Sequence, residues 1–162
     1  MVSKWMINMV AAGAILCVAA PATGALDAPV VLHRAPLDPF HYWSDKDLAS
    51  LVKKPNVSVD LSDHEFFFID TILRDTSGMV EVHDRWNDYL VIQKGDGAIA
   101  YGGKAADLKE VTPGEWRGAT MSGAKVVLVH PGDLIVIPAG MAHQMRLNPG
   151  RTIRYLAFKA RQ

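Results

Sequence analysis

Two stretches decide the predicted fold of this chain: Glu81-Val-His-Asp-Arg-Trp-Asn-Asp88-Tyr-Leu-Val-Ile-Gln-Lys-Gly95 and Gly132-Asp-Leu-Ile-Val-Ile-Pro-Ala-Gly-Met-Ala-His143. Glu81 and His83 lie two positions apart, so on a strand both side chains leave the same face. Asp88 opens the apolar run that follows, and the second stretch delivers His143 just past a Pro-Ala-Gly turn. The pattern predicts that two imidazoles and two carboxylates converge inside one small barrel.

Short apolar or alternating runs continue on both sides of these stretches, each bounded by Gly, Pro, Asn or Asp. The pattern predicts strands at 65–73, 78–83, 88–94, 98–101, 125–129, 134–137, 144–147 and 152–158. No long helical pattern interrupts them. An all-β sandwich or barrel is therefore expected.

The second stretch resembles the second sequence motif of the cupin family, G-x5-P-x-G-x2-H-x3-N. Four positions match at the family spacing: Gly132, Pro138, Gly140 and His143. Asn148 lies one position late. The resemblance covers roughly residues 65–160 and implies a double-stranded β-helix, the jelly-roll barrel of the cupins.

The first stretch is similar to the first cupin motif, G-x5-H-x-H-x3/4-E-x6-G, with substitutions. His83 takes the second histidine position, Asp88 the acidic position and Gly95 the closing glycine. Glu81 replaces the first histidine, and Asp75 replaces the opening glycine. The resemblance specifies the fold better than the chemistry, because one barrel fold hosts many unrelated activities.

A metal site follows from the residue types in these motifs. Borderline divalent ions such as Fe, Mn, Ni or Zn bind neutral imidazoles and carboxylates. Glu81, His83 and His143 would supply two nitrogens and one carboxylate. Asp88 would be a fourth ligand, a residue that orients a histidine, or a catalytic base. The alternative is a polar pocket that has lost its metal.

The residues that line the barrel interior are predicted from the alternation of side chains along each strand. Leu90, Ile92 and Met145 share the parity of Asp88 and His143, so they are expected to face the interior. The 36 residues between Gly95 and Gly132 predict a long hairpin or loop. Its Trp116 and Arg117 are expected either to cover the mouth of the barrel or to lie on an exposed hairpin. No site role is assigned to the other histidines, His33, His41, His64 and His130.

The amino terminus has the layout of a secretory signal peptide. Lys4 precedes an uncharged run at 5–20, and small residues follow at 21–25. The alternatives are a membrane anchor or an apolar tail, but the run is shorter than the ~20 residues of a typical spanning helix. Residues 1–25 are therefore predicted to be removed, leaving a periplasmic or secreted protein.

Residues 26–56 are predicted to form an extended arm and one short helix before the barrel at 57–162. Prolines punctuate the arm. Ser44-Asp-Lys-Asp47 resembles a capping box, and Leu48 and Leu51 follow at helical spacing. Pro55 blocks continuation of the helix.

The charge balance excludes some partners. The chain has 17 basic and 17 acidic residues, and removal of residues 1–25 deletes only Lys4 among them, leaving 16 and 17. A net charge near −1 gives no electrostatic case for nucleic acid or for an anionic membrane. The expected partners are a small-molecule ligand or substrate and a second copy of the chain, as a homodimer.

These observations lead to several functional hypotheses. The first is an exported metal-dependent enzyme acting on a small organic molecule, with a dioxygenase or another oxidoreductase as the leading reaction class. A lyase or isomerase is the second. The third is a non-catalytic barrel that binds a small ligand.

Overall fold

The computed structural model describes residues 30–32 and 40–162. The predicted signal peptide and most of the predicted arm lie outside the described residues. Within the described part of the chain, no helix is long and apolar enough to cross a membrane.

Strands account for most of the described chain, with one short helix. In chain order the elements are β1 (Val30–Leu32), α1 (Asp45–Leu51), β2 (Val57–Asp63), β3 (Phe67–Arg74), β4 (Val80–His83), β5 (Trp86–Lys94), β6 (Gly97–Tyr101), β7 (Lys104–Ala106), β8 (Lys109–Thr112), β9 (Glu115–Gly118), β10 (Thr120–Ser122), β11 (Lys125–Val129), β12 (Leu134–Ile137), β13 (His143–Arg146) and β14 (Ile153–Arg161). All eight predicted strands are present. The predicted all-β architecture with one short helix is confirmed.

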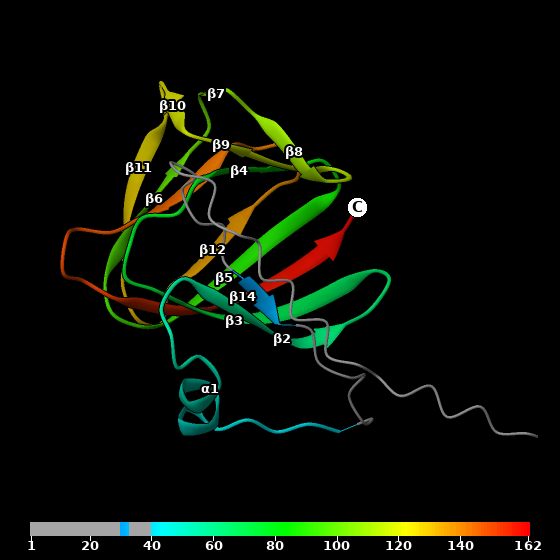
Figure 1. The fold of residues 1–162 in the computed structure, drawn as a ribbon, viewed down its shortest axis with the longest axis vertical. Coiled ribbons are helices and arrows are strands. Elements are labelled where there is room, and N and C mark those ends of the chain that lie inside the picture. The colour runs from blue at the N-terminus through cyan, green and yellow to red at the C-terminus, as the bar shows by residue number, and fades with distance from the viewer. Residues whose placement is uncertain (1–29, 33–39) are drawn as a thin grey trace, which may run out of the picture.

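Two six-stranded sheets face each other across the core (Figure 1). The first has the order β1-β2-β3-β14-β5-β12, and the second has the order β11-β6-β13-β4-β9-β8. β1 pairs with β2 in parallel, and the other strand pairs in the described part of the chain are antiparallel. The strands β7 and β10 form a separate two-stranded ribbon.

The helix α1 begins as its sequence predicts. The side chain of Ser44 accepts a hydrogen bond from the Asp47 amide at 3.2 Å, and the Asp47 carboxylate accepts one from the Ser44 amide at 3.0 Å. This reciprocal capping satisfies two amides that the helix itself leaves unpaired. Leu48 is buried, so the short helix is anchored by its apolar face.

The core lies between the two sheets. Leu90, Ile92 and Met145 are buried in it, as their parity predicts. The other members of the cluster are Ile72, Ile99, Val129, Ile137, Ile153, Tyr155 and Ala157. Residues from both sheets thus close the barrel at one end and leave the polar cluster at the other.

Two glycine corners bring the motif strands together. The Gly140 amide donates a hydrogen bond to the carbonyl of His83 at 2.7 Å, which fixes the β12–β13 turn against the end of β4. Gly95 has φ +78°, and a Cβ there would lie 2.0 Å from the carbonyl oxygen of Thr152. Only glycine fits such a corner without a backbone shift.

Candidate metal centre

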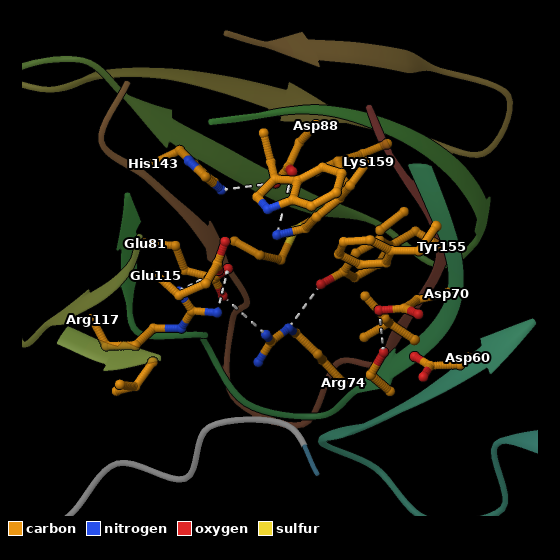
Figure 2. Close-up of a pocket in the computed structure, with 18 of the residues that line it drawn as sticks. Asp60, Asp70, Arg74, Glu81, Asp88, Glu115, Arg117, His143, Tyr155 and Lys159 are labelled. Atoms are coloured by element: carbon orange, nitrogen blue, oxygen red, sulfur yellow. Dashed lines mark hydrogen bonds and ion pairs between the residues drawn. The ribbon is translucent and has the colours of Figure 1, made fainter. Parts of the chain in front are cut away.

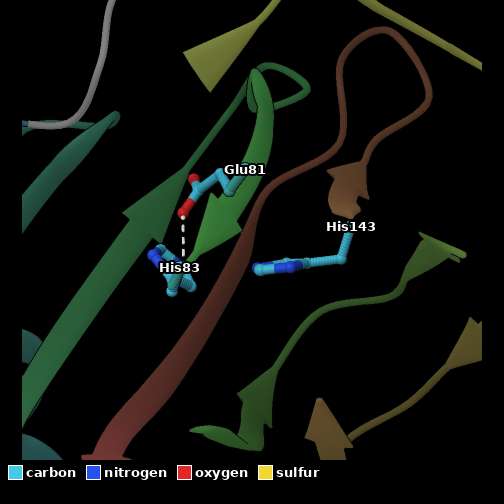
Figure 3. Close-up of side chains that lie close together, drawn as sticks. All are labelled: Glu81, His83 and His143. Atoms are coloured by element: carbon cyan, nitrogen blue, oxygen red, sulfur yellow. Dashed lines mark ion pairs between the residues drawn. The ribbon is translucent and has the colours of Figure 1, made fainter. Parts of the chain in front are cut away.

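Four predicted ligands meet at the inner face of the barrel. β4 contributes Glu81 and His83, β5 contributes Asp88, and β13 contributes His143. β13 pairs with β4 so that His143 lies opposite Glu81. One ligand atom from each of Glu81, His83 and His143 lies within 4.8 Å of the others (Figure 3). The predicted convergence of these side chains is present.

Each imidazole is anchored through Nδ1. The Nδ1 of His83 lies 2.6 Å from Glu115 Oε2, and the Nδ1 of His143 lies 3.0 Å from the carbonyl oxygen of Met141. A carboxylate and a carbonyl oxygen only accept, so each Nδ1 carries the hydrogen. Both Nε2 atoms then face the centre, where each lies 3.3 Å from Asp88 Oδ2.

The carboxylates set the protonation of the centre. Burial lowers the pKa of His83, but hydrogen bonds to Asp88, Glu115 and Glu81 outweigh that effect and raise it to about 10. Burial raises the pKa of Asp88, but the charge of Lys159 and hydrogen bonds from the two histidines hold it well below its usual value. Asp88 is therefore ionised at neutral pH.

Two arginines hold Glu81. Arg117 Nη2 lies 3.4 Å from Glu81 Oε2, and Arg74 Nη2 lies 3.5 Å from Glu81 Oε1. Burial raises the pKa of Glu81, but the charge of Arg117 and a hydrogen bond to His83 lower it well below its usual value. Arg74 also donates from Nε to the hydroxyl of Tyr155 at 2.9 Å.

The predicted lid is instead part of the barrel wall. β9 pairs with β4, so Arg117 lies opposite Glu81, Trp116 opposite Val82, and Glu115 opposite His83. The Arg117 side chain is only 13% exposed. Neither a lid over the mouth nor an exposed hairpin describes this segment, because the pairing turns Glu115 and Arg117 toward the centre.

Lys159, on β14, lies beside His83 and Asp88. Its Nζ is 2.8 Å from His83 Nε2 and 3.3 Å from Asp88 Oδ1. The residue is 8% exposed, and its ammonium lies 5.9 Å from the ring centre of Phe68. A buried cation is therefore in contact with two of the predicted metal ligands.

Sequence reasoning missed four polar residues of this site, Arg74, Glu115, Tyr155 and Lys159, and it named Arg117 without its place beside Glu81. One signal was available. Lys159 shares the interior parity of Tyr155 and Ala157 on β14, and a charged residue at such a position marks a buried polar group. The partnership of Glu115 with His83 has no such signal, because 32 positions separate them.

A cavity of about 480 Å³ opens from the centre into the barrel, and Trp86, Phe68 and Leu90 are among its apolar walls. Figure 2 shows a carboxyl pair, Asp60 and Asp70, across the cavity from Glu81 and Glu115. Burial and the hydrogen bond with Asp60 raise the pKa of Asp70 to about 8, against a hydrogen bond from Ser58. Asp70 therefore carries a proton near neutral pH and donates it toward Asp60.

The donor set fits a borderline divalent ion. Histidines that bind metals usually donate their other ring hydrogen to a carboxylate or a carbonyl oxygen, and both histidines do so here. Two imidazoles with Glu81 supply the nitrogen and oxygen ligands that such ions prefer. Arg117, Arg74 and Lys159 already neutralise these ligands, so an ion would compete with resident cations.

Comparisons with known proteins are informative only at the level of structure. No family model matches the sequence, and no curated protein matches it. A protein of solved structure from Bacillus halodurans is 14% identical, with a TM-score of 0.54 over 78% of this chain and 86% of that one. A second, from Neisseria meningitidis, is 11% identical, with a TM-score of 0.54 over 74% and 99%.

A cupin 2 conserved barrel domain protein from Rhodopseudomonas palustris also matches, at 19% identity and a TM-score of 0.45. The match covers 64% of this chain and 60% of that one. The facing antiparallel sheets and the matched corner from Gly132 to His143 agree with the motif resemblance. The likeness to the Bacillus halodurans and Neisseria meningitidis proteins shows the fold alone, a barrel of two facing sheets.

The chain departs from the cupin motif at one predicted ligand. Glu81 occupies the position of the first motif histidine, yet it lies within the same cluster as His83 and His143. The substitution exchanges a neutral ligand for an anionic one. Its charge is balanced by Arg117 and Arg74, which explains why a carboxylate is tolerated at a buried position.

Proposed function

We propose that this chain is a metal-dependent cupin enzyme that converts a small organic molecule in the barrel cavity. The observation that carries the proposal is the anchoring of both imidazoles through Nδ1, which leaves Nε2 of His83 and of His143 directed at one point beside Glu81. Side chains held only for stability need no such common orientation.

The ligand set favours one reaction class. Two histidines and one carboxylate with open positions are the set of non-haem iron oxygenases, so a dioxygenase reaction is the first to test. A divalent ion bound there would act as a Lewis acid toward a substrate oxygen. A lyase or isomerase reaction would also use an ion that polarises a substrate oxygen, and it is the next class to test.

The cavity favours a small organic acid or carbonyl compound as substrate. The Nε of Arg117 is buried without a hydrogen-bond acceptor, so a ligand carboxylate or carbonyl would satisfy it. Trp86 and Phe68 provide apolar contact for the rest of such a molecule. Protonated Asp70, on the opposite wall, offers a hydrogen bond to a second oxygen.

Asp88 is proposed as the fourth ligand or as the group that orients the histidines. Its oxygen lies equally far from both Nε2 atoms, and its pKa is held well below the usual value. A carboxylate with a lowered pKa accepts protons poorly at neutral pH, which weakens the case for a catalytic base. The catalytic role of Asp88 remains a prediction.

Elemental analysis tests the metal proposal. Protein purified without chelators should contain close to one Fe, Mn, Ni or Zn ion per chain, and EDTA treatment should lower its melting temperature, because an ion that binds only the folded state stabilises it. Repeated preparations without metal, and no stabilisation by any of the four ions, would contradict the proposal.

A non-catalytic binding role is the second candidate, favoured by Lys159. The carboxylates of the centre are compensated without any ion, since Lys159, Arg74, Arg117 and a His83 with a pKa raised to about 10 face Asp88, Glu81 and Glu115. Such a pocket would bind a ligand without converting it. Turnover of any carboxylate that binds the metal-loaded protein would favour the enzyme, and tight binding without turnover would favour the binder.

Export is proposed from the amino-terminal sequence. The leader-like segment 1–25 would direct the chain to the periplasm or outside the cell. Exported material should begin between about residues 21 and 27 by amino-terminal sequencing. Soluble cytoplasmic protein that keeps Met1 would contradict export.

A homodimer is proposed to form through the edge strands β11 and β12. They end the two sheets, and Leu128 and Leu134 on them are 70% and 62% exposed. Unpaired strand edges with exposed apolar side chains favour pairing with a second copy.

Leu128→Asp with Leu134→Asp should give the mass of one chain in sedimentation, whereas the exposed apolar control Val111→Asp should not change the mass. A single-chain mass for the wild type at all concentrations would contradict the dimer.

A further inference from the structure

The ammonium of Lys159 lies next to two of the predicted metal ligands. Its Nζ lies 2.8 Å from His83 Nε2, the nitrogen that the proposed function assigns to the metal. It also lies 3.3 Å from Asp88 Oδ1. An ammonium at these distances uses the same two ligands that a divalent ion would use.

We propose that Lys159 is the resident cation of the centre, and that a divalent ion binds only by displacing its ammonium from His83 and Asp88. This inference rests on the proposed metal function. It assigns Lys159 the role of setting metal affinity, because its ammonium competes with the metal for the ligands.

Two features of the surroundings support the exchange of the Lys159 ammonium for a divalent ion. First, Asp88 depends on this cation, because its buried Oδ1 has no hydrogen-bond partner in the described part of the chain and lies 3.3 Å from the Lys159 ammonium. Removing the ammonium without a replacement would leave a buried charge with less compensation. Second, the ammonium cannot stay, because a divalent ion bound at the same ligands would repel a cation a few ångströms away.

The Lys159 side chain also has space to move away from His83. Lys159 lines the cavity, and its ammonium is already near the face of Phe68. Its charge acts on Asp70, which lies on the neighbouring strand β3 and also lines the cavity. A lysine side chain has four rotatable bonds, so the ammonium can withdraw from His83 into the cavity without a change in β14.

The test compares metal affinity in three variants of the full chain. Lys159→Met keeps the apolar length and removes the charge, Lys159→Arg keeps the charge, and Lys94→Met removes an exposed lysine on β5 as a control. Affinity for Zn(II) and Mn(II) is measured by calorimetric titration after EDTA treatment. Melting temperature is measured in the metal-free state.

Lys159→Met should bind metal at least about tenfold more tightly than the wild type, because a like charge is removed from the ligands. Its metal-free form should melt at a lower temperature, because Asp88 loses its cation. Lys159→Arg and Lys94→Met should stay within a few-fold of the wild-type affinity. If metal-free Lys159→Met does not fold, refolding with metal present should recover it.

The outcomes separate this inference from the proposed function. Equal or weaker binding by Lys159→Met, with binding by the wild type, overturns the inference and leaves the metal function standing. Binding by Lys159→Met alone supports the inference and overturns a metal role for the wild type. Absence of binding in both overturns both. Tenfold tighter binding by Lys159→Arg overturns the inference, because the charge would then not be the competitor.

Discussion

His143→Ala should abolish the rise in melting temperature that Zn(II) or Mn(II) gives the wild type. The substitution removes one of three ligand groups that lie within 4.8 Å of one another, and two remaining ligands hold a divalent ion poorly. At an ion concentration of 100 times Kd the wild type gains about 2.7 kcal/mol, all of which the variant should lose. Thermal denaturation with and without metal measures the difference.

Two variants control this prediction. His130→Ala alters an exposed histidine, which pairs with Asp96 at the surface, and should keep the full metal response. Glu81→His restores the cupin motif residue and should preserve or tighten binding. An unchanged metal response in His143→Ala would place the ion elsewhere, and loss of the response in His130→Ala would show binding at the surface.

The stability of the wild type should fall as the pH rises from about 4 to about 8, because of Asp70. In the folded state its pKa is raised to about 8, whereas an unfolded aspartate titrates near 3.9. In this window the folded chain keeps a proton that the unfolded chain releases, so folding becomes less favourable as the pH rises. The stability present below about pH 4 is therefore lost progressively as the pH approaches 8.

Asp70→Asn should reduce this pH dependence to the part that His83 contributes above about pH 6.5, since its folded-state pKa is raised to about 10. The amide stays neutral, donates toward Asp60 as the protonated carboxyl does, and accepts from Ser58. Relative to its stability at pH 5, the wild type should lose on the order of 1–3 kcal/mol by pH 8, and the variant should lose less. Urea denaturation across this pH range measures both.

An exposed aspartate provides the control for this titration. Asp84 lies in the turn after β4, and the stability of Asp84→Asn should depend on pH as that of the wild type does. A wild-type stability that is flat between pH 4 and pH 8, or an Asp70→Asn variant with the same slope as the wild type, would show that Asp60 and Asp70 share no proton.

The fold was predictable because short-range sequence patterns indicate its strands, its helix start and its turns. Alternation placed Leu90, Ile92 and Met145 in the interior, and all three are buried. The capping residues placed the start of α1, and Pro138 and Gly140 placed the β12–β13 turn. In each case the decisive interaction lies within a few residues, or in the period of one strand, where a sequence shows it directly.

The convergence of the four predicted ligands was predictable for the same reason, since Glu81 and His83 share one strand face and a spaced motif supplied His143. The residues that contact these four side chains were not predictable in this way. Lys159 meets His83 across 76 positions, and Glu115 meets it across 32. Such contacts depend on which strands become neighbours, and the pairing of β9 with β4 is a property of the whole sheet.

The missed partners changed the chemistry of the site more than its location. The predicted ligands alone indicated a metal site or a polar pocket that has lost its metal. With Arg74, Arg117 and Lys159 present, the carboxylates are already compensated. A metal ion bound there would compete with these cations, so its affinity would depend on residues outside the motifs.

Anomalous X-ray diffraction from a crystal grown with Zn(II) or Mn(II) tests the metal centre most directly. We expect one anomalous peak within about 2.0–2.3 Å of Nε2 of both His83 and His143, with Glu81 at the ion and the Lys159 ammonium withdrawn from His83. Absence of a peak at these nitrogens, with Lys159 Nζ still 2.8 Å from His83 Nε2, would contradict the metal centre.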